Sequence, residues 1–585
     1  MAMQQNKDIK NIYTIKNDQQ ENAYNLFQIL SKMKIARIGR FFNSVKRCGV
    51  NVSDIIMLLV LMPFHHISSI PMLVKSGMGE NQGVNCGNSV YYDLKNNAKV
   101  NWRSLLYLVA LRFKHLGEEL NMKMVNKTRA FIVDDSPLQK SGIKTELVSR
   151  VHDHVSGEFI FGYKILVLGY WDGFSFYPLD FSLHREKGNQ ADKVKKRLDT
   201  ANWRVSAQCK VKKEYAKILT EAERSLILVK KQNKGKQTKA AIKQIETAKN
   251  KVKRARKKYK AEEAKYAELT NKATELRAEL KETRKKHPDY GLTKKQMNNQ
   301  YTKDRDAGTP GAQRVAEADM KKTTSMLAML KRAVKRKFIP DYVLTDSWFF
   351  NQALVRAVSK LTKRHKINLV SMAKMNTTKY KLMANNKYYN AAELLIKLER
   401  QAVTARSHKA KYIKVAVSFG DIRVNLFFIK IGQASSWKLL VTNDLTINFQ
   451  KLMEVYQIRW SIEIFFRESK QYLNLGKSKS TCFDAQIADA TISLTQYTIL
   501  SFHQRITKYG SFDGVFASAL EDAMQNSIAA ELQKMFLILV EMFCEMAGID
   551  VIELTGSVIR NEQVSKKIIN LNPIFYQKLE KHHAA

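Results

Sequence analysis

Residues 456–470 form the stretch that decides the fold, and they read YQIRWSIEIFFRESK. Within it, Tyr456, Arg459, Glu463 and Lys470 stand at relative positions 0, 3, 7 and 14. At about 100° per residue, a helix places these four side chains within a sector of about 60°. The neighbouring face is apolar and carries Val455, Ile458, Ile462, Phe465 and Phe466. A carboxylate held among two cations and a phenol is suited to gripping a metal ion and a phosphate.

Two earlier segments end in carboxylates. Residues 130–137 (AFIVDDSP) read as a short buried strand that ends at Asp134 and Asp135. Residues 342–348 (YVLTDSW) read as another strand that ends at Asp346. Further strands are predicted at residues 163–170 and 174–179, which form a hairpin around an Asp-Gly turn, and at residues 367–372.

The order of the elements predicts the fold. Strand, hairpin, helix (about 315–335), strand, strand and helix follow one another as in a ribonuclease-H-like fold, whose first and fourth strands are adjacent and parallel. Asp135, Asp346 and Glu463 would then meet. Two divalent ions about 3.5–4 Å apart bind one phosphodiester, and such hard cations prefer carboxylate oxygens. We therefore expect an α/β multidomain chain with a ribonuclease-H-like mixed-sheet core.

The pattern Tyr-x2-Arg-x3-Glu-x6-Lys, with Val-Asp-Asp-Ser and Leu-Thr-Asp-Ser upstream, resembles a known family. It is similar to the DDE transposases of bacterial insertion sequences, specifically the group with the Y-R-E-K signature. The resemblance covers roughly residues 125–505, with two insertions. A β-rich insertion between Asp346 and Glu463 is usual in this group. A helical arm between the third and fourth predicted strands is not part of the family pattern.

The resemblance implies a catalytic and metal-binding triad of Asp135, Asp346 and Glu463. It also implies two Mg²⁺ ions per active site, which Mn²⁺ is able to replace, and DNA contacts from Tyr456, Arg459 and Lys470. The first carboxylate stays open between Asp134 and Asp135, which point to opposite sides of a strand. We prefer Asp135, because the acid before Ser or Thr is the usual ligand in this group.

The implied reaction cleaves the ends of an insertion sequence, through a hairpin intermediate, and joins the freed 3′-hydroxyls to target DNA. The implied assembly is a homodimer or a larger synaptic complex. One alternative is a ribonuclease-H-like DNA nuclease or resolvase that does not join strands. Another is a DNA-binding protein whose triad has lost its activity.

The composition favours a nucleic-acid partner. Lys and Arg number 99 against 54 Asp and Glu, which gives a net charge of +45. Such a charge attracts double-stranded DNA by displacing its counterions, and an anionic membrane surface is the rival partner. No apolar run approaches the roughly 20 residues that span a bilayer, and the first residues lack an apolar signal region. We expect a cytoplasmic, nucleoid-associated bacterial protein with no membrane partner.

One segment differs from the rest in its charge and in the spacing of its apolar residues. Residues 201–300 hold 29 Lys and Arg against 11 Asp and Glu, and apolar residues recur from Ala241 to Leu280 at heptad spacing. The pattern predicts two helices folded into an antiparallel coiled-coil arm. It leaves open whether the lysines are a solvated face or contact phosphates, and whether the arm dimerises.

The sequence predicts seven regions. They are a helical N-terminal DNA-binding domain (1–125), the catalytic core in three parts (126–204, 301–375 and 448–510), the basic coiled-coil insertion (205–300), the β-rich insertion (376–447) and a helical C-terminal region (511–585). For residues 1–125, a helical packing domain with a solvated basic face is the alternative.

Other candidate residues carry weaker signals. The five cysteines are scattered singly, without the spacing of a zinc site or a disulfide framework. His152 and His154 invite a metal interpretation, but a polar loop is favoured because no third ligand is near in sequence. Arg467 is able either to reach a phosphate or to pair with Glu468 or Glu463.

Overall fold

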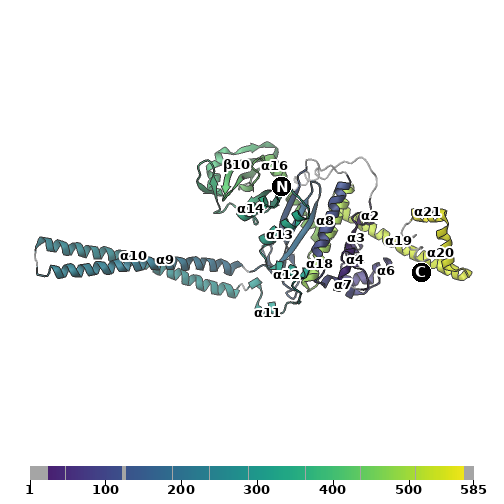
Figure 1. The fold of residues 1–585 in the computed structure, drawn as a ribbon, viewed down its shortest axis with the longest axis horizontal. Coiled ribbons are helices and arrows are strands. Elements are labelled where there is room, and N and C mark those ends of the chain that lie inside the picture. The colour runs from purple at the N-terminus through teal and green to yellow at the C-terminus, as the bar shows by residue number, and fades with distance from the viewer. Residues whose placement is uncertain are drawn as a thin grey trace.

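The computed structural model describes residues 24–46, 48–120, 127–187, 189–235, 238–286, 289–362, 364–434, 436–507 and 509–571. It is a mixed α/β structure whose strands form a single 12-stranded sheet. A long helical hairpin projects from this body on one side, and the C-terminal helices extend on the other (Figure 1). The architecture is compatible with a ribonuclease-H-like core.

The main path of the sheet runs β2-β3-β1-β5-β6-β12-β11-β10-β7-β8, while β4 pairs with β3 and β9 with β10. The strands are β1 (Ala130–Gln139), β2 (Ser149–His152), β3 (Phe159–Trp171), β4 (Phe176–His184), β5 (Tyr342–Thr345), β6 (Asn368–Ala373), β7 (Lys379–Leu382), β8 (Tyr388–Asn390), β9 (Val403–Ala405), β10 (Ala410–Phe419), β11 (Ile422–Ile431) and β12 (Lys438–Thr442). The strands between residues 376 and 447 thus continue the core sheet, through the pairing of β12 with β6.

The first and fourth predicted core strands, β1 and β5, are adjacent and parallel. Strand β6 is parallel to β5, and β3 is antiparallel to β1. The expectation that the first strand ends at its two aspartates is wrong. Pairing with β5 stops at Val133, but pairing with β3 continues to Gln139, so the aspartates lie inside β1.

Two predicted helices are each divided. The helix expected at 315–335 is two helices, α12 (Pro310–Ala318) and α13 (Lys322–Lys335). The signature helix is also two, α16 (Phe449–Gln457) and α17 (Trp460–Tyr472). Between them Arg459 N–H donates to the Tyr456 carbonyl, three residues back, at 3.1 Å. The backbone keeps right-handed helical dihedral angles there, so the break is a tightened turn.

The N-terminal helices share one apolar core with the sheet. They are α2 (Leu26–Lys32), α3 (Ile35–Arg40), α4 (Val52–Leu61), α5 (Ile70–Lys75), α6 (Met78–Asn81), α7 (Asn88–Asn96) and α8 (Trp102–Glu119), with short 3₁₀ turns at Asn43–Val45 and Met62–His65. Helix α18 (Phe483–Ile506) is buried along most of its length and links them to the sheet. Gln496, for example, donates to the carbonyls of Leu59 and Val60.

The segment between β4 and α12 forms the projecting hairpin. Helices α9 (Asn189–Gln232) and α10 (Lys239–Lys286) run antiparallel and contact each other along the hairpin (Figure 1). At its base, apolar side chains of both helices form a small separate cluster of Val194, Leu198, Ala201, Ala273, Leu276 and Leu280. We refer to α9 and α10 as the arm.

The remaining helices are α11 (Lys294–Asn298), α14 (Gln352–Ser359), α15 (Ala391–Leu398), α19 (Phe512–Ala547), α20 (Val551–Arg560) and α21 (Glu562–Leu571), with short 3₁₀ turns at Asp289–Gly291, Glu399–Gln401 and Arg406–His408. In the described part of the chain, no helix combines the length and the apolar character that a membrane span requires.

Candidate active site

Helix α17 lies against β1, and cations of the signature reach the strand. Arg459 Nη1 lies 3.2 Å from Asp134 Oδ2, and Lys470 Nζ donates to Ser136 Oγ at 2.7 Å. Side chains two apart on a strand point to the same face, so Asp134 and Ser136 share the face of β1 that meets α17. The arginine and the lysine therefore stand over the aspartate-bearing strand.

Asp346 follows β5 immediately, on the strand next to β1. Val133 pairs with Thr345 in the parallel register, which places Asp134 beside Asp346 one residue further on. Burial raises the pKa of Asp134 to about 7, the charges of Asp135 and Asp346 add to the rise, and Arg459 opposes it. A carboxyl group held among other carboxyl groups is a place where a bound cation would be stabilised.

Arg459 links Glu463 to Asp134. Arg459 Nη2 donates to Glu463 Oε1 at 2.5 Å, so one guanidinium group bridges Glu463 and Asp134. Side-chain exposure is 15% for Arg459, 17% for Asp134 and 33% for Glu463, so the bridge is largely shielded from water. Among the residues that the structure describes, no group of three Asp, Glu, His or Cys side chains is close enough to hold a metal ion.

Asp135 has different partners from its neighbour. Its Oδ2 accepts a hydrogen bond from Lys322 Nζ of α13 at 2.5 Å, and the same ammonium group donates to Glu186 at 3.1 Å. Lys322 also lies 5.1 Å from the ring centre of Trp348. Asp135 thus points to the opposite face of β1 from Asp134 and does not contact the signature residues. Its assignment as the first metal ligand stays a prediction.

Tyr456 completes the signature from the last turn of α16. Its ring centre lies 5.7 Å from the Arg459 guanidinium carbon. Burial raises the pKa of Tyr456 to about 12, so the phenol stays protonated and able to donate a hydrogen bond at neutral pH. The four signature residues, which come from α16, α17 and the turn between them, therefore lie around Asp134 and Ser136 of β1.

Sequence reasoning missed Lys322, Ser136 and Glu186 as neighbours of the aspartates. The serine was visible, because it follows the two acids directly. Lys322 is 187 positions from Asp135, in a helix whose start was not predicted, so its contact depends on tertiary structure alone.

The structure also shows the surroundings of two weaker candidates from the sequence, the phosphate-binding candidate Arg467 and the metal-binding candidates His152 and His154. The Arg467 side chain is 69% exposed, with Nη2 3.9 Å from Glu468 Oε1. His152 and His154 lie with their Nδ1 atoms 3.2 Å apart, and His152 ends strand β2, which was not predicted. The described residues offer these histidines no set of three metal-binding side chains.

Residues 272–499 match the family model described as "Transposase DDE domain". The match supports a DDE transposase, an enzyme class that cuts and transfers DNA. It spans Asp346 and Glu463, whereas β1 with Asp134 and Asp135 precedes it. No curated protein sequence matches the chain.

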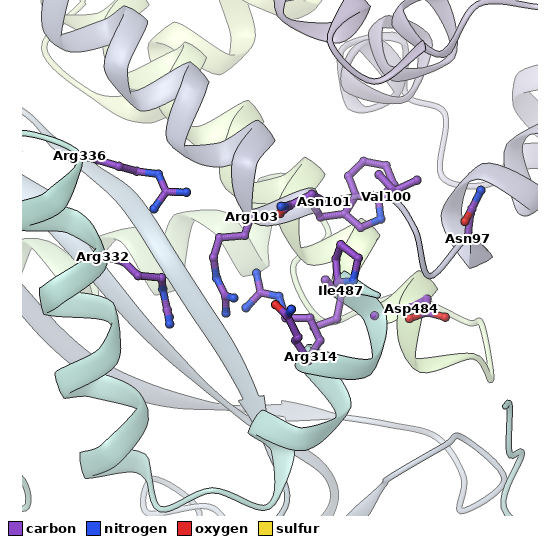
Figure 2. Close-up of a pocket in the computed structure, with 13 residues that line it drawn as sticks. Asn97, Val100, Asn101, Arg103, Arg314, Arg332, Arg336, Asp484 and Ile487 are labelled. Atoms are coloured by element: carbon purple, nitrogen blue, oxygen red, sulfur yellow. The ribbon is translucent and has the colours of Figure 1, made fainter. Parts of the chain in front are cut away.

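A separate pocket lies away from the signature residues, where helices α8, α12 and α13 approach one another (Figure 2). Arg103, Arg314, Arg332 and Arg336 line it. The first three surround the buried carboxylate of Asp180, and Arg103 and Arg332 lie 2.9 and 2.8 Å from it. Burial is the largest single effect on Asp180 and acts to raise its pKa. The three arginines together outweigh burial, so the pKa of Asp180 is lowered from its ordinary value.

This arginine cluster has a structural explanation. Glu317 also pairs with Arg103 and Arg314, at 2.6 and 3.2 Å, so a second carboxylate balances the cations. Because Arg103 belongs to the N-terminal helices and Asp180 to β4, the network ties those helices to the sheet.

Proposed function

We propose that the chain is a transposase of a bacterial insertion sequence, of the Y-R-E-K group, acting on double-stranded DNA. It would cleave the ends of the element and join the freed 3′-hydroxyls to target DNA. The observation that carries this proposal is Arg459, which bridges Asp134 and Glu463 beside Asp346. A bacterial cytoplasm, in association with the nucleoid, is the corresponding location.

The carboxylates at the site are suited to hard divalent cations, because Asp134, Asp346 and Glu463 all offer oxygen ligands. We favour Asp134 as the first ligand, since it shares Arg459 with Glu463. The sequence pattern favours Asp135 instead, whose carboxylate is engaged by Lys322. When bound, two Mg²⁺ or Mn²⁺ ions would activate the attacking oxygen and relieve charge on the leaving oxygen.

The chain's own cations would position the DNA. Arg459 has donors beyond those that it uses for Asp134 and Glu463, so a phosphate oxygen is able to join or replace either carboxylate. Lys470 offers a compact charge on the same face, and burial lowers its pKa. Tyr456 would donate a hydrogen bond from its hydroxyl group to a phosphate or base of the distorted end, in a reaction that we propose passes through a hairpin intermediate.

A cleavage and joining assay tests this function. Asp346→Ala, Glu463→Ala and Asp134→Ala should each abolish cleavage of end DNA and leave end binding nearly intact, and chelation with EDTA should do the same to the unaltered chain. Asp135→Ala is the matched control for Asp134→Ala, because it removes the neighbouring acid that we do not favour as a metal ligand. Full cleavage by Asp346→Ala and Glu463→Ala would refute the proposed active site, and loss only with Asp135→Ala would return the first ligand to Asp135.

Pre-cleaved ends separate transposition from the rival activity. A transposase joins such ends covalently to a target duplex, and gel analysis under denaturing conditions detects the product. A ribonuclease-H-like nuclease or resolvase of this kind cuts the duplex but yields no joined strand.

A homodimer is proposed from an exposed face on α19. Large apolar side chains recur there at alternating intervals of four and three residues: Ile528, Leu532, Met535, Leu539, Met542 and Met546. Each is at least 49% exposed, and Figure 1 shows this end of α19 extending beyond the body. Such spacing is typical of a helix that pairs with another helix.

A second copy of the chain is the occupant that we propose. Six Asp and Glu against one Lys make α19 acidic, which disfavours DNA on this face. If each side chain offers about 200 Å², the exposed parts of these six would bury roughly 700 Å² per chain, which is close to the roughly 800 Å² per partner of a standard stable interface.

Light scattering after size exclusion tests the dimer. The unaltered chain should elute as a dimer, and so should the control Met535→Leu/Met542→Leu. The variant Met535→Lys/Met542→Lys should elute as a monomer. A monomeric unaltered chain, or a lysine variant that remains dimeric, would exclude this interface.

A further inference from the structure

The arm carries its charge unevenly along its length. Its distal part, residues 210–260, holds 19 Lys and Arg against 4 Asp and Glu. The proximal parts, residues 189–209 and 261–286, together hold 12 Lys and Arg against 8 Asp and Glu. Most of the positive charge of the arm therefore lies in the half that is farther from the body.

The densest part of this charge lies on α10. Residues 249–260 read KNKVKRARKKYK, with eight Lys and Arg and no acid, and all eight cations are exposed. The buried positions between them are small, Val252 and Ala255. Ile218, Ile227, Leu228 and Ile242 of the distal arm are also exposed, by 45–64%. Cations outnumber these apolar side chains, so the outer surface of the distal arm offers mainly positive charge to a partner.

Ion pairing within the arm follows the same division. Near the base, Arg197 pairs with Glu279 at 2.9 Å. At mid-length, Lys265 pairs with Glu262 and Lys212 pairs with Glu263, both at 2.9 Å. Within the 249–260 run, Arg256 pairs with Glu223 at 2.7 Å and Lys260 interacts electrostatically with Glu263, whereas the described contacts give the other six cations no carboxylate partner. Unbalanced like charges on one short helical segment repel one another, so a polyanion would stabilise this end of the arm.

The arm is long enough to act at a distance. Helix α9 has 44 residues, which at 1.5 Å per residue span about 66 Å. Figure 1 shows the arm extending away from the body that contains the sheet. At 3.4 Å per base pair, a duplex of about 20 base pairs covers the same length.

We propose that the distal arm, residues 210–260, binds backbone phosphates of double-stranded DNA far from the active site. The inference rests on the proposed function, which makes DNA the substrate, and adds a binding surface that the signature residues do not include. Contacts of this kind are electrostatic and independent of sequence, because each lysine or arginine releases counterions from a phosphate.

Two matched triple variants of the full chain test the proposal. The distal variant is Lys251→Gln/Arg254→Gln/Lys258→Gln. The proximal control is Arg277→Gln/Lys281→Gln/Arg284→Gln, which removes the same charge from exposed positions of the same helix. Binding to a 50-base-pair duplex is measured across a salt series without divalent ions, and circular dichroism checks that helix content is retained.

The distal variant should bind roughly 500-fold more weakly at 100 mM salt, with a slope of log affinity against log salt reduced in magnitude by about 3. The proximal control should stay within about twofold of the unaltered chain. Equal losses in both variants, or no loss in the distal one, would overturn the proposal.

A crosslinking measurement gives an independent answer. A photoreactive side chain in place of Lys257 should capture the duplex, and one in place of Glu275 near the base should not. The absence of capture at Lys257 would contradict the proposal. Because these experiments measure binding alone, an unaltered chain that binds through the distal arm but cannot cut DNA would refute the proposed function and leave this inference standing.

Discussion

The Arg459 bridge gives the sharpest test of the candidate site. Replacing Arg459 with Gln leaves Asp134 and Glu463 without their shared cation in a largely shielded position. Removing one partner of a buried ion pair costs about 3–5 kcal/mol, and the partial exposure of Glu463 lowers this range. We expect the free energy of unfolding to fall by about 3 kcal/mol at pH 8.

The loss in free energy of unfolding caused by Arg459→Gln should depend on pH. The pKa of Asp134 is already raised to about 7 in the folded protein. The stability that protonated Asp134 contributes is therefore present at low pH and is lost as pH rises through 7. Arg459 opposes that rise, so its removal moves the pKa higher. The variant should therefore lose about 1 kcal/mol more at pH 8 than at pH 6, since one pKa unit corresponds to about 1.4 kcal/mol.

Urea unfolding followed by tryptophan fluorescence measures both quantities, with Trp460 next to the site as a reporter. Arg467→Gln is the matched control on the same helix, and its exposed side chain predicts a loss below about 0.5 kcal/mol. In the background of Asp134→Asn, the pH dependence of the Arg459→Gln loss should disappear, whereas in Asp135→Asn it should persist. A loss no larger than that of Arg467→Gln, or one that is equal at pH 6 and 8, would refute the reasoning.

Three other outcomes are expected. Asp180→Asn should lower the free energy of unfolding by about 3–5 kcal/mol, because it leaves buried arginines without their carboxylate, and calorimetry should detect a lower melting temperature. Burial raises the pKa of Glu468 to about 7, so the stability that its protonated form contributes is present below pH 4.5 and lost as pH rises through 7. Glu468→Gln should therefore be more stable than the unaltered chain at pH 8, by up to about 3 kcal/mol in urea unfolding, and equal to it at pH 4.5. The affinity of the unaltered chain for DNA should fall steeply as salt rises, and a flat response in a filter-binding series would exclude the basic surface as the DNA-binding surface.

The signature stretch is predictable from the sequence alone, because helical periodicity fixes which side chains share a face. The two buried strands that carry these acids are equally visible, since apolar runs of that length are typical of central strands. The continuation of β1 past its aspartates is not, because it depends on pairing with β3. The arm is predicted by its heptad spacing and charge. Strand β2 was not predicted, because four residues that contain Arg and His carry no apolar alternation.

The division of the signature between α16 and α17 was not predictable from periodicity, because residues 458 and 459 are ordinary helix formers and the turn tightens only locally. The choice between Asp134 and Asp135 was equally out of reach. Alternation shows that they point apart, but only the packing of α17 and α13 on different faces of β1 determines which of them meets Arg459 and which meets Lys322.

The sequence by itself determined the kinds of groups at the site, their spacing on each element and the charge that attracts DNA, because these follow from residue identity and local geometry. Only the tertiary structure decided which acids, separated by hundreds of residues, share one cation, and which apolar face of α19 is left exposed. Such pairings depend on how strands and helices from distant parts of the chain pack together, and local preferences do not encode that arrangement.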